Sequence, residues 1–278
     1  MKRDLRGRRV LITGASSGIG KCLAEQLARA GAQLALAARS EDKLSVIANS
    51  SAFLGCKVAV LPADVTRDED RRRLLVQTES HLGGLDVLIN NAGVASWAHF
   101  ADSSEAVLRQ IMEVNFFAPA ELIRLAIPLL VEGNQPAVVN VASMCGRRAM
   151  PAWSEYSASK YALCGLTEAL RGELSRFDID VLLMVPGLTR SDLSKNLLLS
   201  QGRMKIDFDR GMAPERVAAA IIAGLRRNRT EKVIGADARW MLLFNKYFPR
   251  LTDWLVGRKV TKLYASESAI GRHGCPTH

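Results

Sequence analysis

Cysteine is scarce in this 278-residue sequence, and the five cysteines are scattered: Cys22, Cys56, Cys145, Cys164 and Cys275. Their odd number and the lack of metal-ligand spacing argue against a disulfide framework and against a zinc site. We therefore expect small apolar side chains in a reducing compartment, with the cytoplasm as the location, and predict no metal site.

Long apolar runs are also missing, because no window holds the roughly 20 uninterrupted apolar residues of a membrane-spanning helix. The basic segment 1–10 continues directly into a predicted strand and a glycine-rich loop, which argues against a signal peptide. With 48% hydrophobic and 24% charged residues, the composition suits one α/β domain with a large core. We predict a single domain over residues 1–278, in which 236–278 form an amphipathic C-terminal extension.

The net charge of +10 raises the question of nucleic-acid binding. The arginines are dispersed, however, in short runs at 71–73, 147–148 and 226–227, and no basic stripe carries interleaved aromatic residues. We expect solvated surface charge and no nucleic-acid partner. An affinity for phosphorylated ligands or for an anionic membrane surface stays open.

Short apolar segments alternate with longer helical patterns along the whole chain, which is typical of a parallel sheet with crossover helices. Several of these segments lack polar alternation, as expected when helices cover both faces of a sheet. The predicted fold is a Rossmann-like, doubly wound α/β sheet of about seven strands. Strands are expected at 9–13, 33–38, 57–61, 86–90, 137–142, 179–185 and 232–234. Helices are expected at 18–30, 41–49, 67–82, 103–131 (broken into two near Pro119), 154–177 and 214–227.

A glycine-rich loop, Thr-Gly-Ala-Ser-Ser-Gly-Ile-Gly at 13–20, follows the first predicted strand and opens the first predicted helix. Its glycines permit a tight turn and a close backbone approach, and the helix N-terminus offers free amides and a positive dipole end to a pyrophosphate. The candidate cofactor contacts in this loop are Gly14, Ser16, Ser17, Gly18, Ile19 and Gly20.

Tyr156 and Lys160 lie four residues apart, so that a helix would place both side chains on one face. A neighbouring ammonium favours the phenolate, and we expect it to lower the pKa of Tyr156 toward neutral pH. Such a pair alone is more typical of a solvated helix face. Ser143 lies thirteen residues before Tyr156, at the end of an apolar run.

The chain resembles the short-chain dehydrogenase/reductase family in six motifs that occur in the family's order and intervals over about residues 7–235. They are Thr-Gly-x-x-x-Gly-x-Gly at 13–20, Asn-Asn-Ala-Gly at 90–93, Asn115, Ser143, Tyr156-x-x-x-Lys160 and Pro186-Gly187. The resemblance implies the compact type of the family.

The resemblance also implies the catalytic roles. Tyr156 would protonate the developing alkoxide in carbonyl reduction and act as the base in the reverse direction. Lys160 would lower the pKa of Tyr156 and hold the nicotinamide ribose, and Ser143 would bind the substrate carbonyl. Asn115 would bind a water that links Lys160 to solvent. Structural alternatives are a helix-bending role for Asn115 and a cap for Ser143.

The choice of cofactor depends on the end of the second predicted strand. Ala38 stands where NAD-preferring relatives carry Asp, and Arg39 offers a planar cation to a 2′-phosphate. NADP(H) is therefore favoured and NAD(H) is the alternative. Ser17 departs from this pattern, because many NADP-preferring relatives have Lys or Arg there.

Three further segments are candidate cofactor contacts by resemblance: Asp64 and Val65, then Asn91, Ala92 and Gly93, then Pro186, Gly187, Thr189 and Ser191. Asp64 could instead cap the following helix, and the hydroxyls of Thr189 and Ser191 could be turn residues. Residues 192–209 are predicted to form a lid over the substrate, with an apolar inner face of Leu193, Leu197, Leu198 and Leu199.

Beyond residue 237 apolar and aromatic residues recur at helical spacing, interrupted by Pro249 and followed by Arg258 and Lys259. The residues are Trp240, Leu243, Phe244, Tyr247, Phe248, Leu251, Trp254 and Leu255. This tail could pack over the substrate cleft or on a second subunit, which we favour. Alternatively, 238–259 could lie on a membrane surface, which would make the protein peripheral to a membrane. The tail loosely resembles those of relatives that reduce lipid or steroid-like ketones.

We conclude from the sequence that the chain is an NADP(H)-dependent carbonyl reductase or alcohol dehydrogenase with a lipophilic carbonyl substrate. The alternative is a non-catalytic dinucleotide-binding sensor of the same fold, which would need none of the four catalytic residues together. By resemblance we expect a homodimer or homotetramer, built on the helix that holds Tyr156 and the preceding one.

Overall fold

The structure is a computed structural model, and it describes residues 3–190, 193, 197–202 and 207–263. Two residues named above, Ser191 and Cys275, lie outside the described residues.

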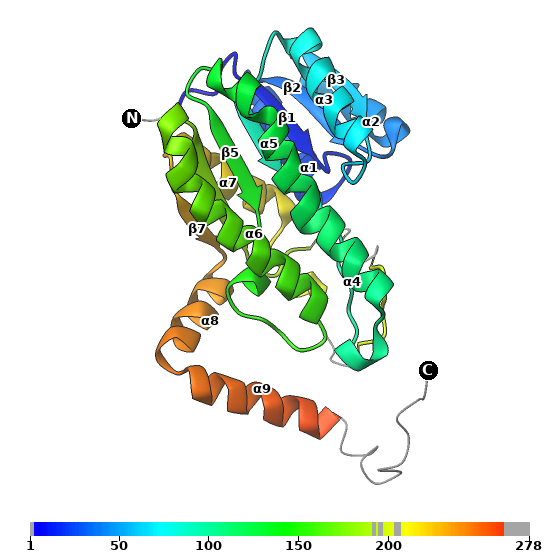
Figure 1. The fold of residues 1–278 in the computed structure, drawn as a ribbon, viewed down its shortest axis with the longest axis vertical. Helices are drawn as coiled ribbons and strands as arrows, with labels where there is room; N and C mark the ends of the chain where they lie inside the picture. Colours follow the sequence, from blue (N-terminus) through cyan, green and yellow to red (C-terminus); the bar gives the residue numbers. More distant parts are fainter. Residues whose placement is uncertain (1–2, 191–192, 194–196, 203–206, 264–278) are drawn as a thin grey trace.

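Seven parallel strands form one sheet in the order β3-β2-β1-β4-β5-β6-β7 (Figure 1). The strands are β1 Arg9–Thr13, β2 Gln33–Ala38, β3 Val58–Pro62, β4 Val87–Asn90, β5 Ala137–Val141, β6 Asp180–Pro186 and β7 Glu231–Ile234. Each predicted strand is confirmed to within one residue. The strand order reverses between β1 and β4, and in doubly wound sheets ligands bind beyond the carboxyl ends at such a point.

Helices cover both faces of the sheet (Figure 1). One face packs on α1, α2 and α7, and the other face packs on α3, α5 and α6. The helices are α1 Gly18–Arg29, α2 Glu41–Ala48, α3 Asp68–Leu82, α4 Glu105–Met112, α5 Ala118–Val131, α6 Ser154–Glu173, α7 Pro214–Arg226, α8 Ala236–Tyr247 and α9 Pro249–Leu263. The predicted Rossmann-like fold is confirmed.

The central strands are mostly apolar because neither face meets water. All five residues of β5 are buried, including Asn140. A buried amide costs free energy unless it is hydrogen-bonded. Asn140 meets this requirement by accepting from Asn90 Nδ2 at 2.9 Å and donating to Thr167 Oγ1 at 2.9 Å. The two bonds join β4, β5 and α6 beneath the carboxyl edge of the sheet.

The predicted division of 103–131 into two helices near Pro119 is confirmed by α4 and α5, but the chain stays helical between them. The helical segment runs from Glu105 to Val131, with a π-helical turn, Glu113–Phe117, between α4 and α5. Pro119 lies in the first turn of α5, directly after this wider turn, where its missing N–H does not interrupt the chain. The segment is long and apolar enough to cross a membrane, but Leu122 and Leu130 pack in the protein core.

At the amino ends of the strands, arginine side chains pair with carboxylates and carbonyls. Arg9 Nε and Nη2 donate to Asp86 at 3.1 and 2.6 Å, and Asp86 also accepts from the backbone N–H groups of Arg9 and Asn134, both at 2.8 Å. Arg3 pairs with Asp180 at 2.6 Å. Burial alone would raise the pKa of Asp86, but its hydrogen bonds outweigh burial and hold the pKa below the usual value.

The arginine run at 71–73 is paired along its own helix. Arg72 bonds to Asp68 at 2.7 Å and Arg73 to Asp70 at 2.7 Å. These pairs at helical spacing are typical of surface charge on a solvated helix.

Candidate active site

The glycine-rich loop lies at the carboxyl end of β1, where the backbone must pass close to its neighbours. A Cβ on Gly20 would lie 2.1 Å from the carbonyl oxygen of Gly14, and a Cβ on Gly14 would lie 2.8 Å from Ala92 Cα. Gly14 also has φ +65°, which favours glycine. The first turn of α1 holds no acidic residue, so nothing neutralises its positive dipole end. The loop can therefore receive an anionic group.

Thr13 and Asn91 hold this loop against the turn that follows β4. Thr13 Oγ1 accepts from the N–H groups of Asn91 at 3.0 Å and Ala92 at 3.1 Å. In return, Asn91 Nδ2 donates to the carbonyl of Thr13 at 3.0 Å and to that of Gly14 at 3.2 Å. The sequence analysis assigned Thr13 no role of its own, although it is the first residue of the glycine motif.

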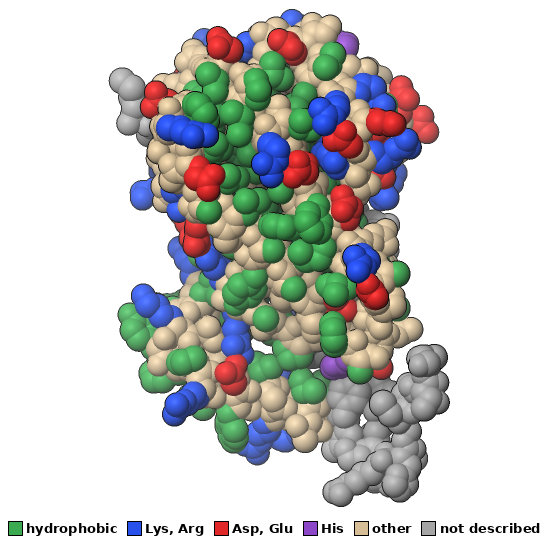
Figure 2. Space-filling model, in the orientation of Figure 1, with side chains coloured by type: hydrophobic (Ala, Val, Ile, Leu, Met, Phe, Trp, Pro, Cys, Tyr) green, Lys and Arg blue, Asp and Glu red, His purple; other side chains and the backbone are tan. Residues whose placement is uncertain are grey.

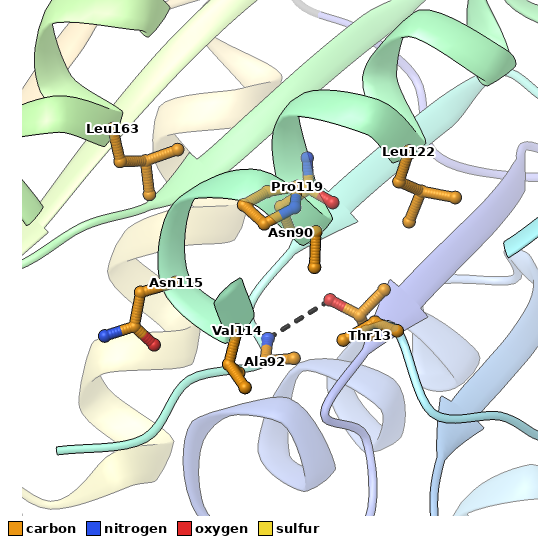
Figure 3. A pocket seen from close by; sticks show the side chains of 10 residues that line it. Thr13, Asn90, Ala92, Val114, Asn115, Pro119, Leu122 and Leu163 are labelled. Carbon is orange, nitrogen blue, oxygen red and sulfur yellow. Dashed lines mark hydrogen bonds between the residues drawn. The ribbon is translucent and has the colours of Figure 1, made fainter. Parts of the chain in front are cut away.

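A small cavity opens beside this junction, at the reversal of strand order between β1 and β4 (Figure 3). Figure 3 also shows the Thr13–Ala92 hydrogen bond at one side and Asn115 at the other. The cavity is lined by Thr13, Val65, Asn90, Ala92, Val114, Asn115, Ala118, Pro119, Leu122 and Leu163. It brings together Val65, Ala92 and Asn115, which the sequence predicted in three separate motifs.

Tyr156 and Lys160 project from the first turns of α6 into the protein. Both are buried, with 8% and 4% of their surface exposed. Lys160 Nζ donates to the carbonyl of Val141 at 3.1 Å and lies 5.8 Å from the centre of the Tyr156 ring. The Tyr156 hydroxyl is hydrogen-bonded to the side chain of Ser143. The predicted Ser143, Tyr156 and Lys160 thus lie together at the carboxyl end of β5.

The predicted lowering of the pKa of Tyr156 is wrong in this structure. Burial raises the pKa of the Tyr156 phenol well above its ordinary value, and its hydrogen bond to Ser143 opposes this only partly. Burial likewise lowers the pKa of Lys160 to about 8. Desolvation disfavours the charged form of both groups, so it dominates over any attraction between ammonium and phenolate. Tyr156 is therefore a protonated hydrogen-bond donor at neutral pH.

Asn115 occupies the π-helical turn between α4 and α5, and its side chain is buried. Its Oδ1 accepts from the N–H of Val94, and its Nδ2 donates to the carbonyl of Val94 and to Ser159 Oγ, all at 2.9 Å. Both amide hydrogens are thus used in tying the turn after β4 to α6. A Cβ on Gly93 would lie 3.2 Å from Asn115 Oδ1 and 3.6 Å from Lys160 Nζ. The predicted water site of Asn115 stays a prediction.

Ser143 begins the short turn Met144–Gly146 after β5. Its Oγ accepts from the N–H of Cys145 at 3.1 Å, so the capping role considered from the sequence is present. Because the same hydroxyl is hydrogen-bonded to Tyr156, the cap also fixes the position of Ser143 beside the phenol.

An apolar cluster surrounds Tyr156. The rings of Trp153 and Tyr156 meet edge to face with 5.5 Å between their centres, and Phe208 packs on Trp153 at 6.4 Å. The other members are Ala95, Trp97, Cys145, Met150, Leu193 and Leu197. The sequence analysis missed the aromatic members. The one available signal was Trp153, three residues before Tyr156.

The segment predicted as a lid is hydrogen-bonded across this cluster where the structure describes it. Leu198 N–H donates to the carbonyl of Ala95 at 2.9 Å, and Trp97 N–H donates to the carbonyl of Leu199 at 2.8 Å. Leu193 and Leu197 pack on the apolar cluster, as predicted for the inner face of a lid.

The groups predicted to select the cofactor lie at the ends of β2 and β3. Arg39 follows β2, is exposed, and forms no hydrogen bond or ion pair with the residues that the structure describes. Asp64 Oδ1 accepts from the N–H and hydroxyl of Thr66 at 3.0 and 2.7 Å, which closes the turn before α3. Asp64 therefore holds the turn but does not cap α3, whose N-cap residue is Arg67. Its contact with a cofactor stays a prediction.

The segment after β6 is held on both sides. Gly187 N–H donates to the carbonyl of Ile234 at 2.8 Å, and Thr189 Oγ1 donates to the carbonyl of Gly187 at 3.0 Å. A Cβ on Gly187 would lie 2.9 Å from the Cβ of Ala238. The Thr189 hydroxyl therefore stabilises the turn. Helix α8 begins directly beside this loop.

Two observations bear on other chemistry. Over the described ranges, no group of three His, Cys, Asp or Glu side chains could hold a metal ion. Four of the cysteines are free thiols, and two of these, Cys22 and Cys164, are buried.

Comparison with known proteins agrees with this arrangement. The family model described as short chain dehydrogenase matches residues 8–201. The 11-beta-hydroxysteroid dehydrogenase-like 2 protein of Arabidopsis thaliana is 35% identical over 255 residues, which cover 91% of this chain and 82% of the relative. The chain belongs to the short-chain dehydrogenase/reductase family of oxidoreductases.

Two solved structures extend the comparison. A short chain dehydrogenase/reductase from Burkholderia phymatum in complex with NAD has a TM-score of 0.81 at 22% identity, covers 90% of this chain and 96% of its own, and shows the shared fold. A short chain dehydrogenase from Burkholderia cenocepacia J2315 in complex with NADP has a TM-score of 0.78 at 25% identity, with 91% and 99% covered.

Proposed function

We propose that the protein is an NADP(H)-dependent reductase of a lipophilic ketone or aldehyde, or the corresponding alcohol dehydrogenase. The observation that carries this proposal is a buried, protonated Tyr156 that is hydrogen-bonded to Ser143 within an apolar cluster. A polar donor in an otherwise apolar site suits a substrate with one carbonyl on a hydrophobic frame.

The residues present fit a dinucleotide. The loop at Gly14 and Gly20 leaves no room for a Cβ, and α1 directs an unneutralised N-terminus toward it. Arg39 is an exposed guanidinium, unpaired among the described residues, at the strand end where a 2′-phosphate would lie, which favours NADP(H), and NAD(H) is the alternative. Both cofactors occur among the structural neighbours. Bound NADP(H) would supply or accept the hydride.

The side chains of this chain would handle the proton. Ser143 would donate to the substrate carbonyl oxygen and position it, while Tyr156 would donate its proton to the same oxygen as negative charge develops there. Lys160 would stabilise the phenolate left behind. Asn115 would fix the wall beside Lys160, as its hydrogen bonds to Val94 and Ser159 indicate. In oxidation of an alcohol the same groups would act in reverse.

The apolar cluster supports a lipophilic substrate. Trp97, Trp153 and Phe208 provide large aromatic surfaces around Tyr156, and a rigid hydrophobic molecule loses little entropy against such walls. The hydroxysteroid dehydrogenase-like relative agrees with a substrate of this kind.

The same proposal includes a homodimer or homotetramer in the cytoplasm. Helices α5 and α6 and the turn before α5 expose apolar residues on the outside of the molecule: Phe117, Val131 and Tyr161 have 48%, 42% and 44% of their surface exposed. Exposed apolar groups on adjoining helices favour association with a second copy.

The test follows loss of nicotinamide absorbance with NADPH and NADH in parallel, against carbonyls from short polar ketones to steroid-like and long-chain lipids. We expect faster turnover with NADPH and a preference for lipophilic ketones, with Tyr156→Phe as the blank. Binding of NADPH without turnover of any carbonyl in the panel would instead favour the dinucleotide-binding sensor.

A further inference from the structure

The C-terminal helix α8 exposes an apolar stripe. Trp240, Leu243, Phe244 and Tyr247 follow one another at intervals of three, one and three residues, which places them on a single helix face. Between 40% and 70% of the surface of each is exposed. The residues that the structure describes therefore do not bury this stripe, so the predicted packing over the substrate cleft is wrong for these side chains, and packing on a second subunit stays a prediction.

The stripe continues through Phe248, which follows α8, into α9. Phe248, Leu251, Trp254 and Leu255 are between 45% and 55% exposed. Helix α9 packs mainly on α8 and lies apart from the sheet and its covering helices (Figure 1). An ion pair of Asp253 with Arg148 at 2.6 Å links it to the main body.

The charges of α8 and α9 are arranged around the stripe. The two helices carry six Lys or Arg and two Asp. Both carboxylates face the body of the protein, because Asp253 pairs with Arg148 and the oxygens of Asp237 lie 3.3 Å from where a Cβ on Gly187 would be. Hydrophobic and basic side chains dominate the part of this surface that Figure 2 shows.

Basic groups also adjoin the stripe directly. The Arg258 guanidinium lies 5.2 Å above the Trp254 ring. At the start of α8, Arg239 lies near Lys232, whose pKa is lowered by burial and by the neighbouring guanidiniums of Arg227, Arg229 and Arg239. The apolar stripe thus has positive charge at both ends.

The combination of exposed aromatic residues with nearby positive charge distinguishes between two partners for this surface, a protein and a lipid bilayer. The buried centre of a protein–protein interface is depleted of Lys and of charge in general. Helices that lie in a lipid interface combine exposed aromatic residues with Lys and Arg beside them. The lysines of the same two helices, Lys246, Lys259 and Lys262, accompany the exposed aromatic residues and match the second pattern.

We propose that the face formed by residues 240–255 of α8 and α9 docks on an anionic phospholipid bilayer, with the aromatic stripe among the headgroups and the flanking Lys and Arg on lipid phosphates. This docking does not depend on the proposed activity. It would place the bilayer beside the loop of Arg148, which leads to Trp153 and Tyr156, and so beside the apolar cluster where a lipophilic substrate would bind.

The test is flotation of the full chain with vesicles of phosphatidylcholine alone and of phosphatidylcholine with phosphatidylserine at about 3:1. We expect binding to the mixed vesicles that weakens with added salt, and little binding to phosphatidylcholine alone. Trp240→Ala/Trp254→Ala should reduce the partition constant by about tenfold or more. Lys259→Glu/Lys262→Glu should reduce it by a similar factor.

A matched control is Leu54→Ala/Lys57→Glu, which changes an exposed apolar and an exposed basic residue near the amino end of β3. It should bind vesicles like the unaltered chain. Unchanged circular dichroism and unchanged oxidation of NADPH by a water-soluble carbonyl would show that each variant folds.

Two results would overturn the proposal. One is no flotation of the unaltered chain with anionic vesicles. The other is a Trp240→Ala/Trp254→Ala variant that floats normally but sediments as a smaller oligomer, because the stripe would then contact a second copy. If the unaltered chain floats with anionic vesicles but turns over no carbonyl, the proposed function is refuted and the docking proposal is not.

Discussion

The two ends of the β-sheet both bury charged or polar side chains, but they differ in how many hydrogen bonds these side chains form. At the amino ends, Asp86 is 3% exposed and accepts four hydrogen bonds, two of them from the Arg9 guanidinium. At the carboxyl ends, Lys160 is 4% exposed, and among the described residues its side chain donates one hydrogen bond, to the carbonyl of Val141.

The difference shows in the pKa values. Partners hold the pKa of Asp86 below its usual value despite burial, whereas burial prevails at Tyr156 and Lys160. A fully paired group contributes to stability, and a group left under-paired in a cleft is available for chemistry. We infer that the amino end of the sheet maintains the fold and the carboxyl end carries the function.

The largest expected effect is at Tyr156. Tyr156→Phe keeps the ring and its contact with Trp153 but removes the only proton that the phenol can donate. We expect kcat/KM for carbonyl reduction to fall by about a thousandfold, within the range for loss of a general acid. Affinity for NADPH, measured by fluorescence titration, should change little. A Tyr156→Phe variant that keeps about a tenth or more of the kcat/KM of the unaltered chain would contradict the mechanism.

Asp86→Ala tests the other end of the sheet. It leaves the Arg9 guanidinium without its carboxylate and two backbone N–H groups without an acceptor. We expect the free energy of unfolding to fall by about 3 kcal/mol, as for other broken, largely buried ion pairs. Denaturant unfolding measures this change. Below the unfolding transition, kcat/KM should be unaltered, and a selective loss of activity would refute the division between the two ends.

A smaller effect is expected at Arg39, at the strand end that we propose selects the cofactor. Arg39→Asp replaces a guanidinium by a carboxylate that can accept from ribose hydroxyls and repel a 2′-phosphate. The ratio of kcat/KM for NADPH to that for NADH should fall by roughly tenfold to a hundredfold, the value of a lost charge-assisted hydrogen bond. Arg67→Asp, on an exposed residue before α3, is the control. An unchanged ratio in the Arg39 variant would reject the assignment.

The smallest effect is a pH dependence. Because burial lowers the pKa of Lys160 to about 8, its positive charge is lost as the pH rises through that value. The quantity kcat/KM for the cofactor reports groups of the free enzyme, and above that pKa it should fall by about tenfold per pH unit. With an unshifted lysine it would stay level to about pH 10. Steady-state rates in buffers of constant ionic strength distinguish the two.

The sequence predicts much of the structure at the carboxyl ends of the strands and little of it at the amino ends. The strands and the glycine loop were predictable because apolar segments and turn glycines obey local rules. The Asp86–Arg9 pair joins residues 77 positions apart, and nothing in the local pattern of either residue indicates the other.

The errors have the same origin. The pKa of Tyr156 was judged from Lys160, its neighbour in sequence, whereas burial by the fold decides it. Pro119 indicates the division into α4 and α5 by local rules, but it does not indicate the π-helical turn at Glu113–Phe117 that joins them. The exposure of Trp240 and Trp254 depends on where α8 and α9 lie relative to the body, which helical periodicity does not determine.

The most direct test of the account compares Tyr156→Phe and Asp86→Ala in one experiment that records both NADPH-dependent carbonyl turnover and the free energy of unfolding. We predict that Tyr156→Phe loses turnover while its unfolding free energy stays within about 1 kcal/mol of the unaltered chain, and that Asp86→Ala does the reverse. Turnover that survives in Tyr156→Phe, with the most reactive carbonyl of the panel, would contradict the central claim.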